Sequence, residues 1–95
     1  MITLASVPSF PRGVKYRHDA ARGVWVLLTP ERAMMPDENA QAVLSGIDGK
    51  RTVGDIVSDL AARYQAPAEV IMADVLELLG DLAARGVIVD RGEGS

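Results

Sequence analysis

The fold of this chain is decided by the stretch Trp25-Val26-Leu27-Leu28-Thr29-Pro30-Glu31-Arg32. Its apolar first half is typical of a buried strand, and Pro30 ends that strand because proline has no N–H to donate to a β-ladder. Residues 32–35 follow at once and predict a short strand at the edge of the same sheet. Two extended segments this close in sequence form a small sheet, and the other elements are expected to pack around it.

A further strand is predicted upstream of this stretch. Residues 14–18 alternate apolar and polar side chains, which is typical of a half-buried strand. Residues 19–23 form a hairpin connection in which Gly23 supplies a positive φ angle. The partner strand, residues 24–28, is expected to be the best buried of the three, with Trp25 in the core.

The first two of three predicted helices follow Pro36. Asp37 is expected to cap the first, whose buried stripe comprises Ala40, Val43, Leu44 and Ile47. The second begins at Thr52 and Asp55, which resemble a capping box. Its buried positions are expected to be Val53, Ile56, Val57, Leu60, Ala61 and Tyr64.

A third helix is predicted from Pro67 to about Arg85, with Gly86 as its terminator and a short extended segment at residues 87–89. The order of elements predicts an α+β fold, winged helix-turn-helix-like, with a three-stranded antiparallel sheet followed by three helices. Residues 1–13 are expected to be a flexible arm and residues 91–95 a disordered tail. Residues 14–90 are then a single domain.

Composition and charge exclude several classes of function. The chain has 95 residues, no Cys and one His, so it offers almost no ligands for zinc or an iron–sulfur cluster. No apolar run reaches the roughly 18 residues of a membrane span, and no signal peptide or cofactor is expected. The lack of Cys fits a reducing compartment, and we expect a cytoplasmic protein. Residues 52–95 carry eight acidic and three basic side chains, which disfavours contact with phosphates.

No set of catalytic residues is present. The serines at positions 6, 9, 45 and 58 have no plausible general base, and His18 is expected to be exposed on a strand. Asp74, Glu77 and Asp81 form an acidic stripe on the third helix. That stripe is interpreted as a solvated face, with a contact surface for a basic partner as the alternative.

The apolar face of the third helix is unusually broad. Projected at about 100° per residue, it covers an arc of roughly 160°, more than the ~100° that packing on one core requires. One flank, near Met72 and Leu76, is therefore available to a ligand unless two neighbouring elements cover both flanks. Met34 and Met35 on the edge strand are of a residue type that recurs on peptide-binding surfaces, although one of them can equally belong to the core. The arc comprises Ile71, Met72, Val75, Leu76, Leu78, Leu79 and Leu82.

Four segments carry a resemblance to a known family: Pro11-Arg12-Gly13-Val14, Arg22-Gly23-Val24-Trp25-Val26-Leu27-Leu28-Thr29-Pro30-Glu31-Arg32, Asp48-Gly49-Lys50-Arg51-Thr52-Val53 and Ile56-Val57-Ser58-Asp59-Leu60. In them, and over about residues 7 to 90, the chain resembles the PqqD family of pyrroloquinoline quinone (PQQ) biosynthesis. The resemblance implies a non-catalytic peptide chaperone. Such a protein binds the ribosomally made precursor peptide PqqA and presents it to the radical-SAM enzyme PqqE. Some relatives are fused to the oxidase of the same pathway.

In this family the leader of the peptide adds as a strand to the third strand and lies against the third helix. Carried onto this chain, the resemblance implies that the peptide-binding residues are Arg32, Ala33, Met34, Met35, Met72, Val75, Leu76 and Leu79. Pro36 departs from the aliphatic residue that is usual in relatives. Because it has no N–H to donate, either an added strand ends at Met35 or position 36 points away from the peptide. Ile47, where relatives often have Cys, is a second departure and is expected to be neutral.

Two other functions remain open at this point. A winged-helix DNA-binding regulator is disfavoured, because its recognition helix would bring three acidic side chains to the phosphates. A structural interaction domain would show no response to precursor peptide. The chain is expected to be a monomer, or a dimer that exchanges strands.

Overall fold

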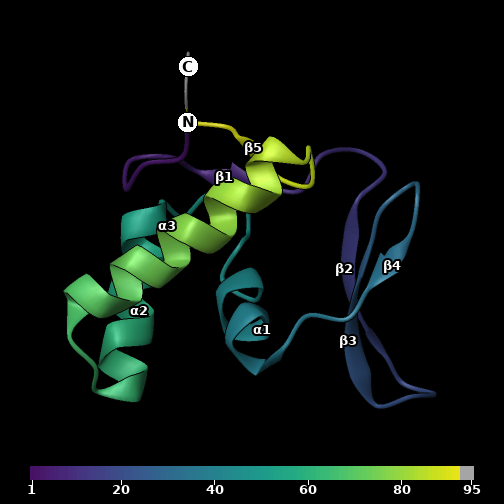
Figure 1. Ribbon diagram of the computed structural model, residues 1–95, viewed down its shortest axis with the longest axis horizontal. Helices are drawn as coiled ribbons and strands as arrows, with labels where there is room; N and C mark the ends of the chain where they lie inside the picture. The colour runs from purple at the N-terminus through teal and green to yellow at the C-terminus, as the bar shows by residue number, and fades with distance from the viewer. Residues whose placement is uncertain (93–95) are drawn as a thin grey trace.

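The computed structural model describes residues 1–92 and contains two small antiparallel sheets and three helices. The larger sheet has the order β2-β3-β4, formed by Lys15–Asp19, Val24–Leu28 and Ala33–Met34. The smaller sheet pairs β1 (Pro8–Ser9) with β5 (Val89–Asp90). Figure 1 shows the larger sheet on one side of the molecule and the helices on the other. The predicted α+β architecture of three strands followed by three helices is confirmed.

Local signals define the three helices, α1 (Glu38–Leu44), α2 (Val53–Tyr64) and α3 (Ala68–Ala84). Asp37 caps α1 as predicted, its side chain accepting from the Ala40 N–H at 2.8 Å. Pro67 was expected to be the first residue of α3, but it is the N-cap, and the helix begins one residue later, at Ala68. At the other end Gly86 has a φ of 76°, the left-handed conformation that terminates a helix.

Thr52 and Asp55 form the predicted capping box at the start of α2. The Thr52 hydroxyl accepts from the Asp55 N–H, and the Asp55 carboxylate accepts from the Thr52 N–H, both at 3.0 Å. The turn before it is held by Asp48, whose carboxylate accepts from the N–H groups of Arg51 and Lys50 at 2.8 and 2.9 Å. These two hydrogen bonds lower the pKa of the Asp48 carboxyl.

Removing this cap should destabilise the domain. We expect Thr52→Ala to lower the free energy of unfolding by about 1 kcal/mol, because the Asp55 N–H in the first helical turn loses the hydroxyl oxygen that accepts from it. Chemical denaturation followed by circular dichroism measures the change. The matched control is Ser58→Ala on the exposed surface of the same helix, which should change stability little. An equal loss in both variants would contradict a specific role of the cap.

The hydrophobic core lies among the three helices and extends to the larger sheet through Leu27. Its centre is made by Leu27 from β3, Leu44 from α1, Ile56 from α2 and Leu79 from α3, each no more than 2% exposed. Ile88, just before β5, is 1% exposed and packs in the same cluster. All three helices and the sheet therefore contribute to one core. Among residues 1–92, no helix is both long and apolar enough to cross a membrane.

The N-terminal segment differs from the predicted flexible arm. β1 pairs with β5 in the register Pro8↔Asp90, and the Arg91 N–H donates to the Val7 carbonyl at 2.8 Å. The start of α2 is also engaged, since the Val53 N–H donates to the Ser6 carbonyl at 2.8 Å. These backbone hydrogen bonds hold residues 6–9 against the domain. Of the predicted tail, residues 93–95 lie outside the described part.

Trp25 and Tyr64 were expected in the core, and the structure places both at the surface. Trp25 is 37% exposed and stacks on Tyr16 with a ring-centroid distance of 4.9 Å. It pairs with His18 near the turn of the β2–β3 hairpin, and Figure 1 shows this hairpin to one side of the helices. Tyr64 is 56% exposed because it is the last residue of α2.

Candidate functional site

The outer edge of β4 is the starting point of the candidate site. In the described part of the chain β4 pairs only with β3, through Leu27↔Met34 and Leu28↔Ala33. Its opposite edge therefore offers backbone N–H and C=O groups to another strand. The strand is shorter than the predicted Arg32 to Met35. Arg32 instead belongs to the preceding turn, where its carbonyl accepts from the Thr29 N–H at 2.9 Å.

A groove with an apolar lining, here called the apolar groove, runs from β4 to α3. It has a volume of about 200 Å³. Met34 points into it because Met34 pairs with buried Leu27 and therefore shares the core-facing side of the sheet. Met35 lines the groove as well and is 66% exposed, so apolar surface is open to solvent here. The lining residues are Leu27, Met34, Met35, Pro36, Ala40, Leu44, Leu78 and Leu82.

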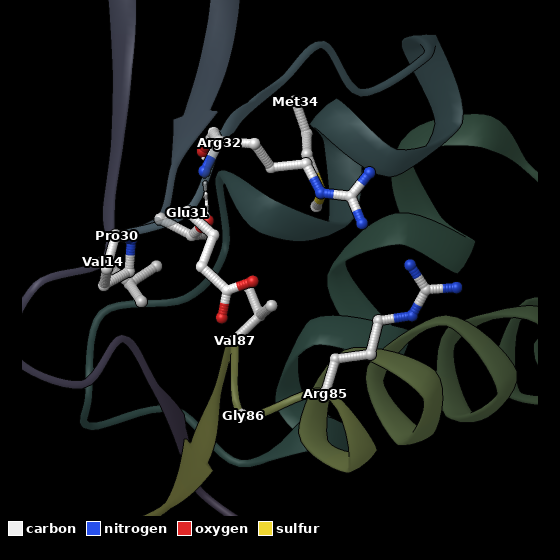
Figure 2. Close-up of a pocket in the computed structure, with 9 residues that line it drawn as sticks. Val14, Pro30, Glu31, Arg32, Met34, Arg85, Gly86 and Val87 are labelled. Carbon is white, nitrogen blue, oxygen red and sulfur yellow. Dashed lines mark hydrogen bonds between the residues drawn. The ribbon is translucent and has the colours of Figure 1, made fainter.

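A second cavity, here called the arginine pocket, adjoins the groove and shares Met34 with it. It has a volume of about 370 Å³ and lies between the β3–β4 turn and the C-terminal end of α3. Figure 2 shows Arg32 and Arg85 directing their guanidinium groups to the same side of the pocket, whereas the Glu31 carboxylate lies toward Val87. The apolar groove and the arginine pocket thus form one continuous surface beside the β4 edge.

The α3 residues that face this surface are not those inferred from the sequence. Val75 and Leu79 are 1% and 0% exposed and lie in the core, which closes their side chains to a ligand. Met72 and Leu76 are half-buried against the core and line neither the apolar groove nor the arginine pocket. Of the predicted set, the structure therefore brings only Arg32, Met34 and Met35 to this surface, whereas Ala33 lines neither cavity.

Leu78, Leu82 and Arg85 take the place of the four predicted α3 residues. At about 100° per residue, Leu78 lies roughly 160° around the helix from Leu76. It belongs to the opposite edge of the same broad apolar arc. One signal in the sequence pointed to Arg85, because it is a basic side chain at the end of an otherwise acidic helix.

The acidic stripe on α3 is exposed at Asp74, Glu77 and Asp81, as expected for a solvated face. Asp81 forms an ion pair with Arg85 at 3.2 Å. Within residues 1–92 no three His, Asp or Glu side chains are gathered as they would be in a metal site. The chemistry that this surface supports is recognition of an extended, partly apolar chain.

Comparisons of the sequence and of the structure with known proteins all indicate the same family. The family model described as coenzyme PQQ synthesis protein D (PqqD) matches residues 24–88. A protein of Bradyrhizobium diazoefficiens named PqqA binding protein is 46% identical over 92 residues, which is 97% of this chain and 89% of the relative. The bifunctional coenzyme PQQ synthesis protein C/D of Methylorubrum extorquens is 44% identical over 84 residues, or 88% of this chain but 23% of that protein.

Two solved structures share the fold. One is the solution structure of the PqqD truncation of Methylobacterium extorquens PqqCD, described as a functional, stand-alone recognition element for ribosomally synthesized and post-translationally modified peptides. It has a TM-score of 0.78 and 42% identity, covering 94% of this chain and 95% of that one. The crystal structure of PqqD from Xanthomonas campestris has a TM-score of 0.57 and 38% identity, covering 92% and 97%. The Bradyrhizobium protein is named for binding and the Methylobacterium structure is described as a recognition element, in agreement with the predicted non-catalytic role.

Proposed function

Because the chain belongs to the coenzyme PQQ synthesis protein D (PqqD) family, we propose that it is a non-catalytic chaperone that binds the precursor peptide PqqA and presents it to the radical-SAM enzyme PqqE. Relatives named PqqA binding protein support the peptide, and the recognition-element description of a similar structure supports the role. A peptide made on ribosomes is available in the cytoplasm, and we place the protein there.

The observation that carries the proposal is the open edge of β4 beside the apolar groove. An extended peptide can add to such an edge, where main-chain hydrogen bonds give affinity and alternate side chains enter neighbouring cavities. Met34 faces the groove and Ala33 the other side of the sheet, so the cavities lie along one face only. Every second side chain of the peptide would then meet the apolar groove or the arginine pocket.

Pro36 sets the length of the proposed added strand. It has no N–H to donate, and its carbonyl already accepts from the Gln41 side chain at 3.0 Å. At the other end, the Arg32 N–H already donates to the Thr29 hydroxyl at 3.2 Å and its carbonyl accepts from the Thr29 N–H, so the hydrogen-bonded segment is confined to residues 33–35. An added strand this short gives modest affinity by itself, and the side chains entering the two cavities must contribute the rest.

An ¹⁵N-HSQC titration with the cognate precursor peptide tests the proposal. We expect the largest shifts at residues 32–35 and at Leu78, Leu82 and Arg85 on α3. The internal control is β2, which forms the other edge of the same sheet and should be unaffected. Shifts confined to β2 would contradict the site, and no shifts at high peptide excess would contradict the function.

A further inference from the structure

Two arginines from distant parts of the chain meet at the arginine pocket. Arg32 comes from the turn before β4, and Arg85 is the C-cap residue of α3. Both line the same cavity, and Figure 2 shows their guanidinium groups approaching it from the strand side and from the helix side. Two like charges that share a cavity favour an anion between them, because guanidinium groups bind carboxylates through paired N–H donors.

The surrounding charges neutralise Arg32 less than Arg85, so Arg32 is expected to attract an anion more strongly. Arg85 is partly neutralised by its ion pair with Asp81, in which both side chains are 56% exposed. Arg32 forms no ion pair with any residue among positions 1–92. Glu31 also lines the pocket, but its carboxylate lies toward Val87, on the side away from the guanidinium groups (Figure 2).

The positions of the two cavities determine which side chains a bound peptide strand must have. Arg32, in the turn before β4, and Met34, on β4, direct their side chains to the same cavity. Arg32 lines the arginine pocket, and Met34 lines both this pocket and the apolar groove. A strand added to β4 has a side-chain period of two. It can therefore direct one side chain to the arginines and the side chain two positions away to the groove.

We propose that Arg32 and Arg85 bind the carboxylate of an Asp or Glu side chain in the precursor peptide, two residues from an apolar side chain that occupies the apolar groove. This inference rests on the proposed peptide-binding function and specifies the class of peptide that the site accepts. The order of the acidic and apolar residues in the peptide depends on the direction of the added strand. Antiparallel addition to β4 places the apolar residue first.

Isothermal titration calorimetry with the cognate precursor peptide tests this assignment. We expect Arg32→Gln to weaken binding by about fivefold, since a partly exposed charge-assisted pair contributes about 1 kcal/mol. Arg85→Gln should also weaken binding of the peptide. The matched control is Arg17→Gln, because Arg17 is an exposed strand arginine on β2, away from the pocket. Raised salt should reduce the difference between wild type and Arg32→Gln.

A second series changes the peptide. Each Asp is replaced by Asn and each Glu by Gln, one at a time, and one of these peptides should bind wild type at least as weakly as the unchanged peptide binds Arg32→Gln. With that peptide, Arg32→Gln should cause no additional loss, which identifies the partner carboxylate. If wild type binds the peptide but Arg32→Gln matches Arg17→Gln, the carboxylate assignment is wrong and the proposed function stands. If wild type does not bind, both are wrong.

Discussion

Met34→Asp should weaken binding of the precursor peptide by about 30-fold or more while the domain remains folded. Met34 lines both the apolar groove and the arginine pocket, and it is only half-buried. A carboxylate at this position must lose water when an apolar side chain of the peptide packs against it. This costs about 2 kcal/mol, or roughly a factor of 30 in affinity. Calorimetry measures the affinity, and circular dichroism verifies the fold.

The matched control for this prediction is Met72→Asp. Met72 is also half-buried against the core, but it lies on the other flank of α3 and lines neither cavity. The substitution should therefore perturb packing to a similar degree and leave the affinity of the folded protein unchanged. The milder pair Met34→Gln and Met72→Gln repeats the comparison with a smaller loss of stability. A loss of affinity restricted to the Met72 variants would place the peptide on the flank first inferred from the sequence.

Leu79→Ala should lower the free energy of unfolding by about 3 kcal/mol, because truncating a buried leucine loses transfer free energy and leaves a cavity. Leu79 is 0% exposed at the centre of the core. In a domain of this size such a loss is a large share of the total stability. Urea denaturation followed by circular dichroism measures it directly.

Leu76→Ala is the comparison for Leu79→Ala on the same helix. Leu76 is only half-buried, so its truncation should cost about 1 kcal/mol. Neither variant should change the affinity of the folded protein for peptide, since neither side chain lines the proposed surface. If Leu79→Ala kept full stability but lost affinity, Leu79 would be a contact residue as the sequence suggested.

The sequence predicted the elements whose signals are local. The Asp37 cap, the capping box of Thr52 and Asp55 and the terminator Gly86 each act within a few residues of their own position, and all three are present. The strand edge of the candidate site was also found in this way, because Pro30 and the short segment behind it determine where β4 can lie.

The predictions that failed concern residues whose burial or exposure depends on elements distant in the sequence. Helical periodicity gives the width of the apolar arc on α3 but not which edge meets β4, so Leu78 and Leu82 were missed. The apolar character of Trp25 says nothing about where its hairpin lies relative to the helices. The pairing of β1 with β5 joins two strands of two residues each from opposite ends of the sequence, and such short strands have no periodic pattern.

The ladder between β1 and β5 also has a consequence for how the domain can be joined to other chains. Residues 8 and 90 are neighbours in space, and Figure 1 shows both strands on a side of the molecule away from β4. Polypeptide fused before β1 or after β5 therefore departs from one face, as in domains that tolerate insertion into larger proteins. An enzyme attached there would leave the outer edge of β4 open to a peptide and would raise the local concentration of captured peptide.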